Sequence, residues 1–337
     1  MGHSRQDSNL ARSSFPVNVA VLAFNNCLTS SVVGMLDVFQ ICNTFWKTRN
    51  ESQENYFDVK LTTTDGDIVY SFNGLPIQPT HCINDIPSID IIIIPPIMSN
   101  IDAAIKENGA LIKWLSDRHS RGSIIASVCT GAFFIAASGL LTGQNATTNP
   151  LIASFFQTQF PDIKLDLGKI LVDEQGIITS GPTYAFVDLF VYIVEKYCSE
   201  EIALQCAKLL LHDKNRSSQL HYFPSIINKE HNDEEIKKVQ SWLEQNSQRA
   251  SITIEAIAHT FHMSPRNFVR RFRRATGETP LNYLQKIRID KAKKIMEISN
   301  KSINEITQYV GYTDSKSFGR LFRKHTGNPP IYNSHQK

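Results

Sequence analysis

An internal repeat constrains the fold of this chain more than any other feature of its sequence. Residues 266–280 (RNFVRRFRRATGETP) and 316–330 (KSFGRLFRKHTGNPP) superpose at an offset of 50 residues. Upstream of each copy lies a shorter segment with apolar residues at helical spacing, followed by a turn. Each copy with its upstream segment therefore has the order of a helix-turn-helix: a helix, a tight turn, a second helix and a terminal glycine. The repeat therefore predicts two such motifs, at residues 253–275 and 302–325.

The segment between the two motifs reads as one connecting helix. Residues 280–298 (PLNYLQKIRIDKAKKIMEI) place Leu284, Ile287, Ala292 and Ile295 on one side. A helix of about 18 residues is ~27 Å long. It can hold two recognition helices about one DNA turn (~34 Å) apart, so we expect double-stranded DNA to be contacted in two adjacent major grooves.

The net charge of +3 hides an asymmetry along the chain. Residues 233–337 contain 19 Lys and Arg against 10 Asp and Glu, whereas residues 1–232 contain 16 against 22. A basic region joined to an acidic one indicates a polyanionic partner for one domain only. A basic surface kept for solubility is the alternative that charge alone leaves open.

The second helix of each motif carries two different faces. Phenylalanines four residues apart form an apolar stripe that must be buried, at Phe268 and Phe272 and again 50 residues later. Cations recur on another face, as Arg266, Arg270 and Arg273 in the first copy and as Lys316, Arg320 and Arg323 in the second. A solvated charged face is the simplest explanation, but a helix-turn-helix places this helix in the major groove, where Arg reads guanine.

Residues 234–337 resemble the AraC/XylS-type DNA-binding domain. The second copy carries the Phe-x-Arg-x-Phe core and the Gly-x-x-Pro closure of that family, although Tyr332 comes one position early. The resemblance implies base contacts by Arg266, Arg270, Lys316 and Arg320, and phosphate contacts by Arg271, Arg274 and Lys324. Asn267, Ser317 and Arg323 complete the predicted DNA-binding set.

The first part of the chain alternates strand and helix signals, which favours an α/β domain with a parallel sheet flanked by helices. Residues 88–96 (SIDIIIIPP) are apolar throughout, as expected of a strand covered on both faces. Residues 103–122 read as one helix. We predict a disordered lead-in, an α/β domain, a linker that loses periodicity, and the DNA-binding domain at residues 1–14, 15–211, 212–233 and 234–337.

Cys129 follows a strand-like run and precedes Thr-Gly and a helical pattern, the arrangement of a nucleophile elbow. This part of the chain resembles the ThiJ/PfpI-like (DJ-1/PfpI) branch of the class I glutamine-amidotransferase fold, which is flavodoxin-like. The resemblance implies a catalytic His where this chain has Asn149, and an acid near residues 29–31, where it has none. An amide cannot accept a proton at neutral pH, so we expect no catalysis, unless His81 or His119 is recruited.

A ThiJ/PfpI-like domain followed by an AraC-type domain is similar to the GlxA-type transcriptional regulators. That likeness implies a front domain that senses a small effector or forms a homodimer. We expect the effector to bind at the carboxyl ends of the strands, near Cys129, Thr130, Asn149, Pro95 and Pro96. The rival interpretations are a Cys hydrolase or deglycase with an appended DNA-binding domain, and a redox sensor based on Cys129.

The cysteines and apolar segments limit the remaining possibilities. Six cysteines are scattered without a CxxC pair, which argues against disulfide scaffolds and zinc ribbons and favours the reducing cytoplasm. No apolar block approaches the ~20 residues that span a bilayer, so we expect no membrane partner. No cofactor or metal is predicted.

Overall fold

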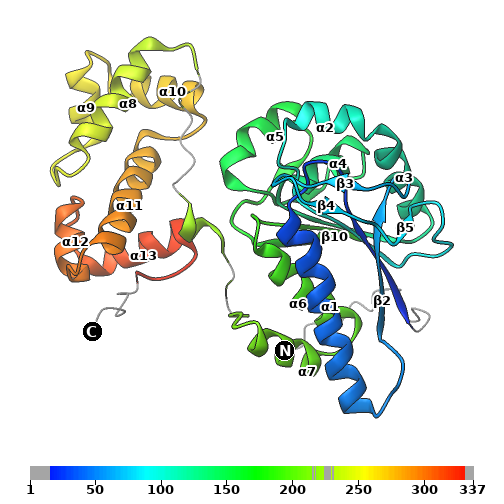
Figure 1. Ribbon diagram of the computed structural model, residues 1–337. Helices are drawn as coiled ribbons and strands as arrows, with labels where there is room; N and C mark the ends of the chain where they lie inside the picture. The colour runs from blue at the N-terminus through cyan, green and yellow to red at the C-terminus, as the bar shows by residue number, and fades with distance from the viewer. Residues whose placement is uncertain (1–15, 215, 217, 224–228, 230, 331–337) are drawn as a thin grey trace, which may run out of the picture. The chain divides into compact units, whose positions relative to one another are not determined.

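The computed structural model of the protein describes residues 16–214, 216, 218–223, 229 and 231–330 (Figure 1). The chain divides into two compact units, one ending at residue 217 and the other beginning at Ser218. This division falls inside the linker expected at residues 212–233. The expected lead-in (1–14) and Tyr332 lie outside the described residues.

A seven-stranded sheet with the order β10-β11-β7-β6-β1-β2-β5 forms the centre of the first unit. Neighbouring strands run parallel except for the antiparallel edge pair β10 and β11. The strands of this sheet are β1 (Val17–Leu22), β2 (Phe57–Thr63), β5 (His81–Cys82), β6 (Ile91–Ile94), β7 (Ile124–Val128), β10 (Leu171–Glu174) and β11 (Ile177–Ser180). Two small sheets pair β3 (Val69–Tyr70) with β4 (Pro76–Ile77) and β8 (Asn145–Ala146) with β9 (Lys164–Leu165).

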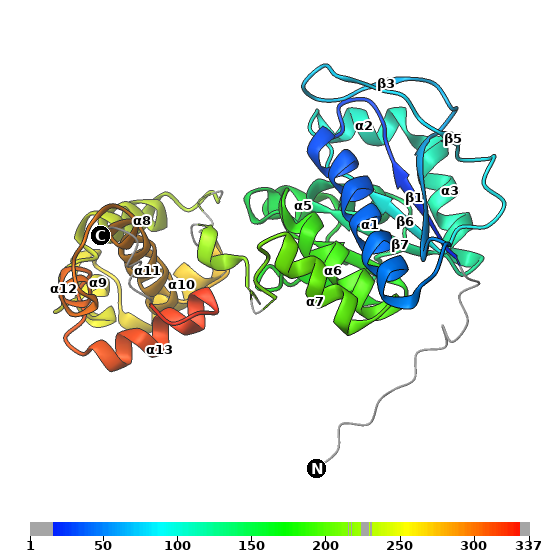
Figure 2. The ribbon, with the colours of Figure 1, turned by 60° about the horizontal axis from the view of Figure 1, so that its bottom comes forward.

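The central strands are buried on both faces, as the apolar run at residues 88–96 predicts. Every residue of β6 and β7 is buried. Two groups of helices flank the sheet (Figure 2), and each group packs together. The groups are α1 (Thr29–Asn50), α6 (Ala185–Tyr197) and α7 (Glu200–Leu209), and α2 (Ile101–Glu107), α3 (Gly109–Ser120) and α4 (Ala132–Ala137). Shorter elements are α5 (Ala153–Gln159), η1 (Cys129–Gly131) and η2 (Pro150–Ile152).

Two helical segments differ from the sequence expectation. The single helix expected at residues 103–122 is two helices, α2 and α3, because the chain leaves helical geometry at Asn108 (φ −104°, ψ 29°) just before Gly109. The Asn108 side chain donates to the Ala104 carbonyl at 2.9 Å and closes α2. Helix α7 was not expected, although Ser199 caps it by accepting from the Ile202 amide.

The second unit is helical and contains two separate cores joined by one helix. Its first core lies among α8 (Glu234–Asn246), α9 (Ile254–Thr260), α10 (Pro265–Thr276) and the first half of α11 (Pro280–Ile298). The second lies among the rest of α11, α12 (Ile303–Tyr309) and α13 (Ser315–Thr326). Figure 1 shows α11 running from the group α8–α10 to α12 and α13, and its bounds match the predicted connecting helix, 280–298.

Each copy of the repeat has its own start and stop signals. Ser264 and Asp314, 50 residues apart, cap α10 and α13, and both helices end at a left-handed glycine. The first helices are capped by Thr253 and Ser302, which are only 49 residues apart. The turn of the second motif therefore holds one residue more than the turn of the first.

A segment that precedes α8 in the chain also belongs to the second unit. The 3₁₀ helix η3 (Leu220–Tyr222) packs against α13. The ammonium group of Lys293 on α11 donates to the carbonyls of Leu220 and Phe223. This part of the predicted linker is thus anchored to the second unit.

Among the described residues, no helix combines the length and apolar character needed to cross a bilayer.

Candidate DNA-binding surface and cysteine elbow

The two recognition helices present their faces as the repeat predicts. Phe268 and Phe272 are fully buried in the first core, and Phe318 and Phe322 are fully buried in the second. The basic residues lie on the exposed sides of the same helices. Those exposed on α10 and α13 are Arg266, Arg270, Arg273, Arg274, Lys316, Arg320, Arg323 and Lys324.

The central arginine of each helix is held by the residue three positions before it. Arg270 donates to the Asn267 side-chain oxygen at 3.1 Å, and Arg320 donates to the Ser317 hydroxyl at 3.1 Å. Residues i and i+3 lie on the same side of a helix, so each pair extends along the exposed face. The two copies thus place their central guanidinium groups in the same local arrangement.

A hollow of about 740 Å³ lies beside α10 and is lined by Arg266, Arg270, Arg273 and Arg274, together with residues of α9. Four guanidinium groups against one carboxylate of the lining, Glu255, leave the surface of this hollow positively charged. Such a surface suits a polyanion whose charges are evenly spaced, as phosphates are in DNA.

Arg271, for which a phosphate contact is expected, is paired with a carboxylate of its own unit. It forms a two-pronged ion pair with Asp233, with Nε donating at 2.7 Å and a terminal nitrogen at 2.8 Å. The hydrogen bond from Arg271 holds the pKa of Asp233 below its usual range. Asp233 also caps α8, so this pair ties the start of α8 to α10. Arg271 is half-buried, and its phosphate contact stays a prediction.

Cys129 sits at a sharp strand-to-helix turn, as the elbow pattern predicts. It follows β7, has a left-handed backbone (φ 55°), and starts the short helix η1 that leads into α4. The turn packs tightly on the end of β6, because a Cβ on Gly131 would lie 2.8 Å from the Ile94 carbonyl oxygen. The left-handed backbone of Cys129, a non-glycine residue, is strained, and strain of this kind is typical of functional turns.

The surroundings of Cys129 do not activate its thiol. The side chain is 4% exposed, and this burial raises the pKa of the thiol. Hydrogen bonds from the backbone of Thr183 and Thr130, and with the side chains of Thr130 and Asn149, only partly oppose that shift. Among these described partners of the thiol there is no imidazole or carboxylate.

The two histidines considered as replacements for the base, His81 and His119, lie elsewhere. His81 is on β5, at the edge of the sheet, and four strand spacings of about 4.8 Å separate that edge from β7. His119 contacts the Ser123 carbonyl at 3.2 Å, at the opposite end of β7 from Cys129. Neither histidine is placed to accept a proton from this thiol.

The five residues expected around the effector come from segments that meet at the elbow. The Thr130 hydroxyl bonds both the amide and the carbonyl of Ile97, which follows Pro95 and Pro96. Asn149 reaches the Cys129 thiol, and neighbouring Thr148 donates to the Cys129 carbonyl at 2.8 Å. All except the half-buried Asn149 are buried.

The sequence reading missed two groups of residues. The pairing of Asp233 with Arg271 spans 38 residues, and no local pattern signals it. Three residues at the start of the predicted linker, His212, Lys214 and Arg216, line a pocket of the first unit with Asp188. Their one signal is the basic run HDKNR that follows α7.

Comparisons with known proteins agree with this architecture. Residues 18–196, more than half of the chain, match the DJ-1/PfpI family, and residues 257–331 match a helix-turn-helix domain. The HTH-type transcriptional regulator GbdR of Pseudomonas aeruginosa is 21% identical over 94% of this chain and 83% of its own length. CdhR of the same species, another HTH-type transcriptional regulator, is 20% identical over 82% of this chain and 81% of its own length.

Three further proteins each match a smaller part of this chain. The HTH-type transcriptional activator RhaS of Salmonella schwarzengrund is 34% identical over 28% of this chain and 33% of its own length. A candidate transcriptional regulator from Vibrio parahaemolyticus has a TM-score of 0.52 at 24% identity, covering 58% of this chain and 98% of that one. A ThiJ/PfpI family protein from Pseudomonas syringae has a TM-score of 0.50 at 21% identity, and the match covers 63% of this chain and 83% of that one. These two structures support the fold alone.

Proposed function

The chain belongs to the DJ-1/PfpI family and carries an AraC-type helix-turn-helix region, which makes it a transcriptional regulator, and we propose that one polypeptide reads two successive major grooves. The observation that carries this proposal is the duplication of the recognition face. Arg270 with Asn267 in α10 and Arg320 with Ser317 in α13 have the same hydrogen-bonded arrangement. Helix α11, with 19 residues, is about 28 Å long, close to one DNA turn of ~34 Å.

Each cation has a role in this proposal. Arg266, Arg270, Lys316 and Arg320 contact base edges from the exposed sides of the recognition helices, since Arg and Lys donate to guanine O6 and N7. Arg274 and Lys324 contact phosphates, which fix position without reading sequence. Asn267 and Ser317 orient the central arginines, and Arg323 lies on the same face as Lys316 and Arg320.

For the first unit we propose a sensory role without catalysis. The support is the raised pKa of the Cys129 thiol, Asn149 at the position of the base, and the absence of acidic residues from the first turn of α1. A small effector would bind at the elbow between Thr130, Asn149 and the end of β6. The unit would also join two copies of the chain in a homodimer in the cytoplasm. Effector binding would then shift an existing equilibrium between conformations with different DNA affinity.

Mapping of the sites that the protein occupies on its genome tests this function. The proposal expects discrete sites, and titration of purified protein on those fragments should give affinities about 10³-fold or more above random DNA. Equal affinity for mapped and random fragments would contradict a sequence-specific regulator. The genes beside the mapped sites would indicate the metabolism from which the effector comes.

A further inference from the structure

Three cysteine side chains of the first unit meet where α1, α6 and α7 pack together. Cys42 lies on α1, Cys198 directly follows α6, and Cys206 lies on α7. The Cys42 thiol is in hydrogen-bonding contact with the thiols of both Cys198 and Cys206. All three are free thiols, and none is among the described partners of Cys129. This thiol cluster (Cys42, Cys198 and Cys206) therefore offers two possible partners to one central sulfur.

Exposure distinguishes the two partners of Cys42. Cys42 and Cys206 are completely buried, whereas Cys198 is half-buried. Buried cysteines commonly pack as small apolar side chains, and this describes Cys206 in the middle of α7. Cys198 has left helical geometry, with φ −113° and ψ −84°, so no following helical turn holds its side chain. A reagent from solvent therefore meets Cys198 before it meets the other two thiols.

The phenol of Tyr56 lies beside the same two sulfurs. Its hydroxyl donates to the carbonyl of Tyr197, one residue before Cys198. The pKa of Tyr56 is raised by burial and by the negative charges that Cys198 and Cys42 carry as thiolates, which places its hydroxyl near both. Its ring packs on Trp46, one helical turn after Cys42, with the ring centres 4.5 Å apart. Tyr56 thus fastens the surroundings of Cys198 to those of Cys42.

The Cys42 thiol is kept in its protonated form. Hydrogen bonds with Cys198 and Cys206, followed by burial, raise its pKa. Oxidation of a cysteine by peroxide depends on its thiolate character and on its exposure. Cys42 is therefore protected from direct attack by a peroxide, and it is placed to react second, with a neighbouring sulfur that has already been oxidised.

We propose that the thiol cluster is a reversible oxidation site, at which a hydroperoxide converts Cys198 to a sulfenic acid and Cys42 then forms a disulfide with it. In the first step the Cys198 sulfur takes one oxygen from the peroxide, which leaves as water or an alcohol. In the second step the Cys42 sulfur displaces the hydroxyl group, which leaves as water with the Cys42 proton. Two thiols are oxidised and one peroxide is reduced, and exchange with a small thiol reverses the change.

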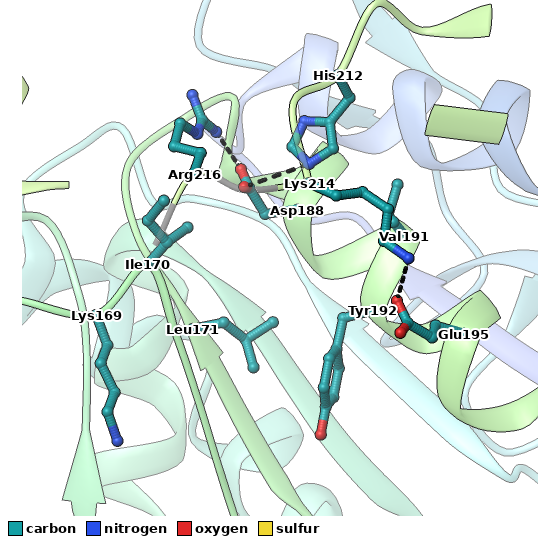
Figure 3. A pocket seen from close by; sticks show the side chains of 10 residues that line it. All are labelled: Lys169, Ile170, Leu171, Asp188, Val191, Tyr192, Glu195, His212, Lys214 and Arg216. Atoms are coloured by element: carbon teal, nitrogen blue, oxygen red, sulfur yellow. Dashed lines mark hydrogen bonds and ion pairs between the residues drawn. The ribbon is translucent and has the colours of Figure 1, made fainter. Parts of the chain in front are cut away.

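A bond between Cys42 and Cys198 joins α1 covalently to the corner between α6 and α7. The segment that follows α7 is tied back to α6, because Asp188 pairs with Arg216 and Glu195 pairs with Lys214 (Figure 3). Oxidation thus acts on the helices that hold the end of the first unit. The disulfide requires neither DNA nor an effector, so the inference goes beyond the proposed function and is tested apart from it.

The test treats reduced full-length protein with hydrogen peroxide, blocks the remaining thiols with iodoacetamide after unfolding, and identifies linked peptides by mass spectrometry without reduction. We expect Cys42 linked to Cys198 as the main product, and dithiothreitol should remove the link. Cys198→Ser should lower the yield of disulfides that contain Cys42 at least about tenfold, since buried Cys206 does not meet the peroxide. Cys82→Ser is the matched control, because Cys82 is also half-buried but its thiol contacts the Thr64 carbonyl at 3.2 Å.

Three results would overturn the assignment: Cys198 recovered as a sulfinic acid while Cys42 stays a free thiol, Cys198 linked only to a second copy of the chain, or a Cys42 disulfide that forms equally well in Cys198→Ser. Cys129→Ser should still form the bond between Cys42 and Cys198, and its absence from that variant would contradict the proposal by placing the first oxidation at the elbow. Circular dichroism of each reduced variant reports its folding. The wild-type digest decides the matter even where a variant does not fold.

Discussion

Arg288 stacks on Tyr312, with its guanidinium carbon 4.9 Å from the centre of the aromatic ring. Arg288 lies in the middle of α11, and Tyr312 lies in the turn of the second helix-turn-helix. The same guanidinium donates to the carbonyls of Ser247 at 2.8 Å and Arg249 at 2.9 Å, just after α8. One buried arginine therefore connects the first helical group to the turn of the second motif.

Gly311 explains why the two groups can approach so closely at this point. Its backbone has φ +91°, and a Cβ there would lie 2.9 Å from the Gln248 carbonyl oxygen and 3.0 Å from Arg288. The contact fixes the orientation of the second motif relative to the first. Two sites read by one rigid body bind with a high effective concentration for the second contact.

Arg288→Met is expected to uncouple the two motifs. It removes two hydrogen bonds to carbonyls and the aromatic stack but keeps the apolar stem. Affinity for an operator with both half-sites should fall about tenfold, whereas affinity for a single half-site should stay near the wild-type value. Titration of both fragments by fluorescence anisotropy gives the comparison.

Lys301→Met is the matched control for that change, because Lys301 lies 5.3 Å from the ring centre of Tyr309 within the second motif and bridges nothing in the first. It should leave both affinities unchanged. Equal losses of Arg288→Met on the full operator and on the half-site would mean that Arg288 only stabilises the fold, and thermal unfolding of the variant would then report that loss.

Arg270→Ala and Arg320→Ala should each weaken specific binding by about 1–3 kcal/mol and relax the preference at a few base pairs of one half-site. The two losses should fall on different half-sites, because the arginines belong to different motifs. Selection of bound sequences from a random pool measures the preference. Lys208→Ala, a charge loss outside the second unit, is the control; equal losses for all three variants would show that charge alone matters.

Asp233→Asn should lower the free energy of unfolding of the second unit by about 1 kcal/mol at neutral pH, since the pair with Arg271 is partly exposed. Asn keeps the cap on α8 but loses the charge. The folded-state pKa of Asp233 is depressed, so its contribution is present above about pH 3.9 and disappears as pH falls through the folded pKa.

Urea denaturation of both proteins between about pH 2.5 and pH 7 measures this difference. Glu235→Gln, which removes an exposed pair with Lys238 on the same helix, should cost less. A difference between wild type and Asp233→Asn that persists unchanged to the lowest pH would contradict the ion pair.

Cys129 should react slowly with iodoacetamide at pH 7.5, because burial raises its pKa above the ordinary value of about 8.5 and keeps the thiol protonated. Labelling should accelerate only at alkaline pH, and the half-buried Cys82 and Cys198 should react before it. Peptide mass spectrometry measures both rates.

Two other experiments address the rival functions of Cys129. Peroxide that changes the DNA affinity of wild type but not of Cys129→Ser would establish a redox sensor. Turnover that is lost in Cys129→Ala would establish a hydrolase.

Local signals in the sequence were sufficient for much of the fold and the candidate site. Ser264 before Pro265 and Gly277 after Thr276 mark the ends of α10, and apolar spacing marks α11. The elbow at Cys129 follows from a short β-branched run before Cys-Thr-Gly. Each of these elements depends on residues within one or two helical turns, so periodicity and capping identify it.

The sequence patterns did not predict the contacts between segments that lie far apart in the chain. The task of Arg271 depends on Asp233, which arrives from another helix, and the surface spacing of the arginines gives no hint of it. The apolar spacing of residues 280–298 predicts the connecting helix but gives Arg288 no role, although three-dimensional packing makes it the bridge between the motifs. The break at Asn108 was missed because apolar spacing continues across it.

The most direct test of two-groove reading by one chain is hydroxyl-radical footprinting of the full-length protein on a mapped genomic site. The account predicts, for each bound chain, two protected segments about 10 base pairs apart on the same face of the duplex. Insertion of about 5 base pairs between them should abolish one of the two protections, since it rotates that half-site to the opposite face. A single protected segment per chain, or two segments that survive the insertion, would contradict it.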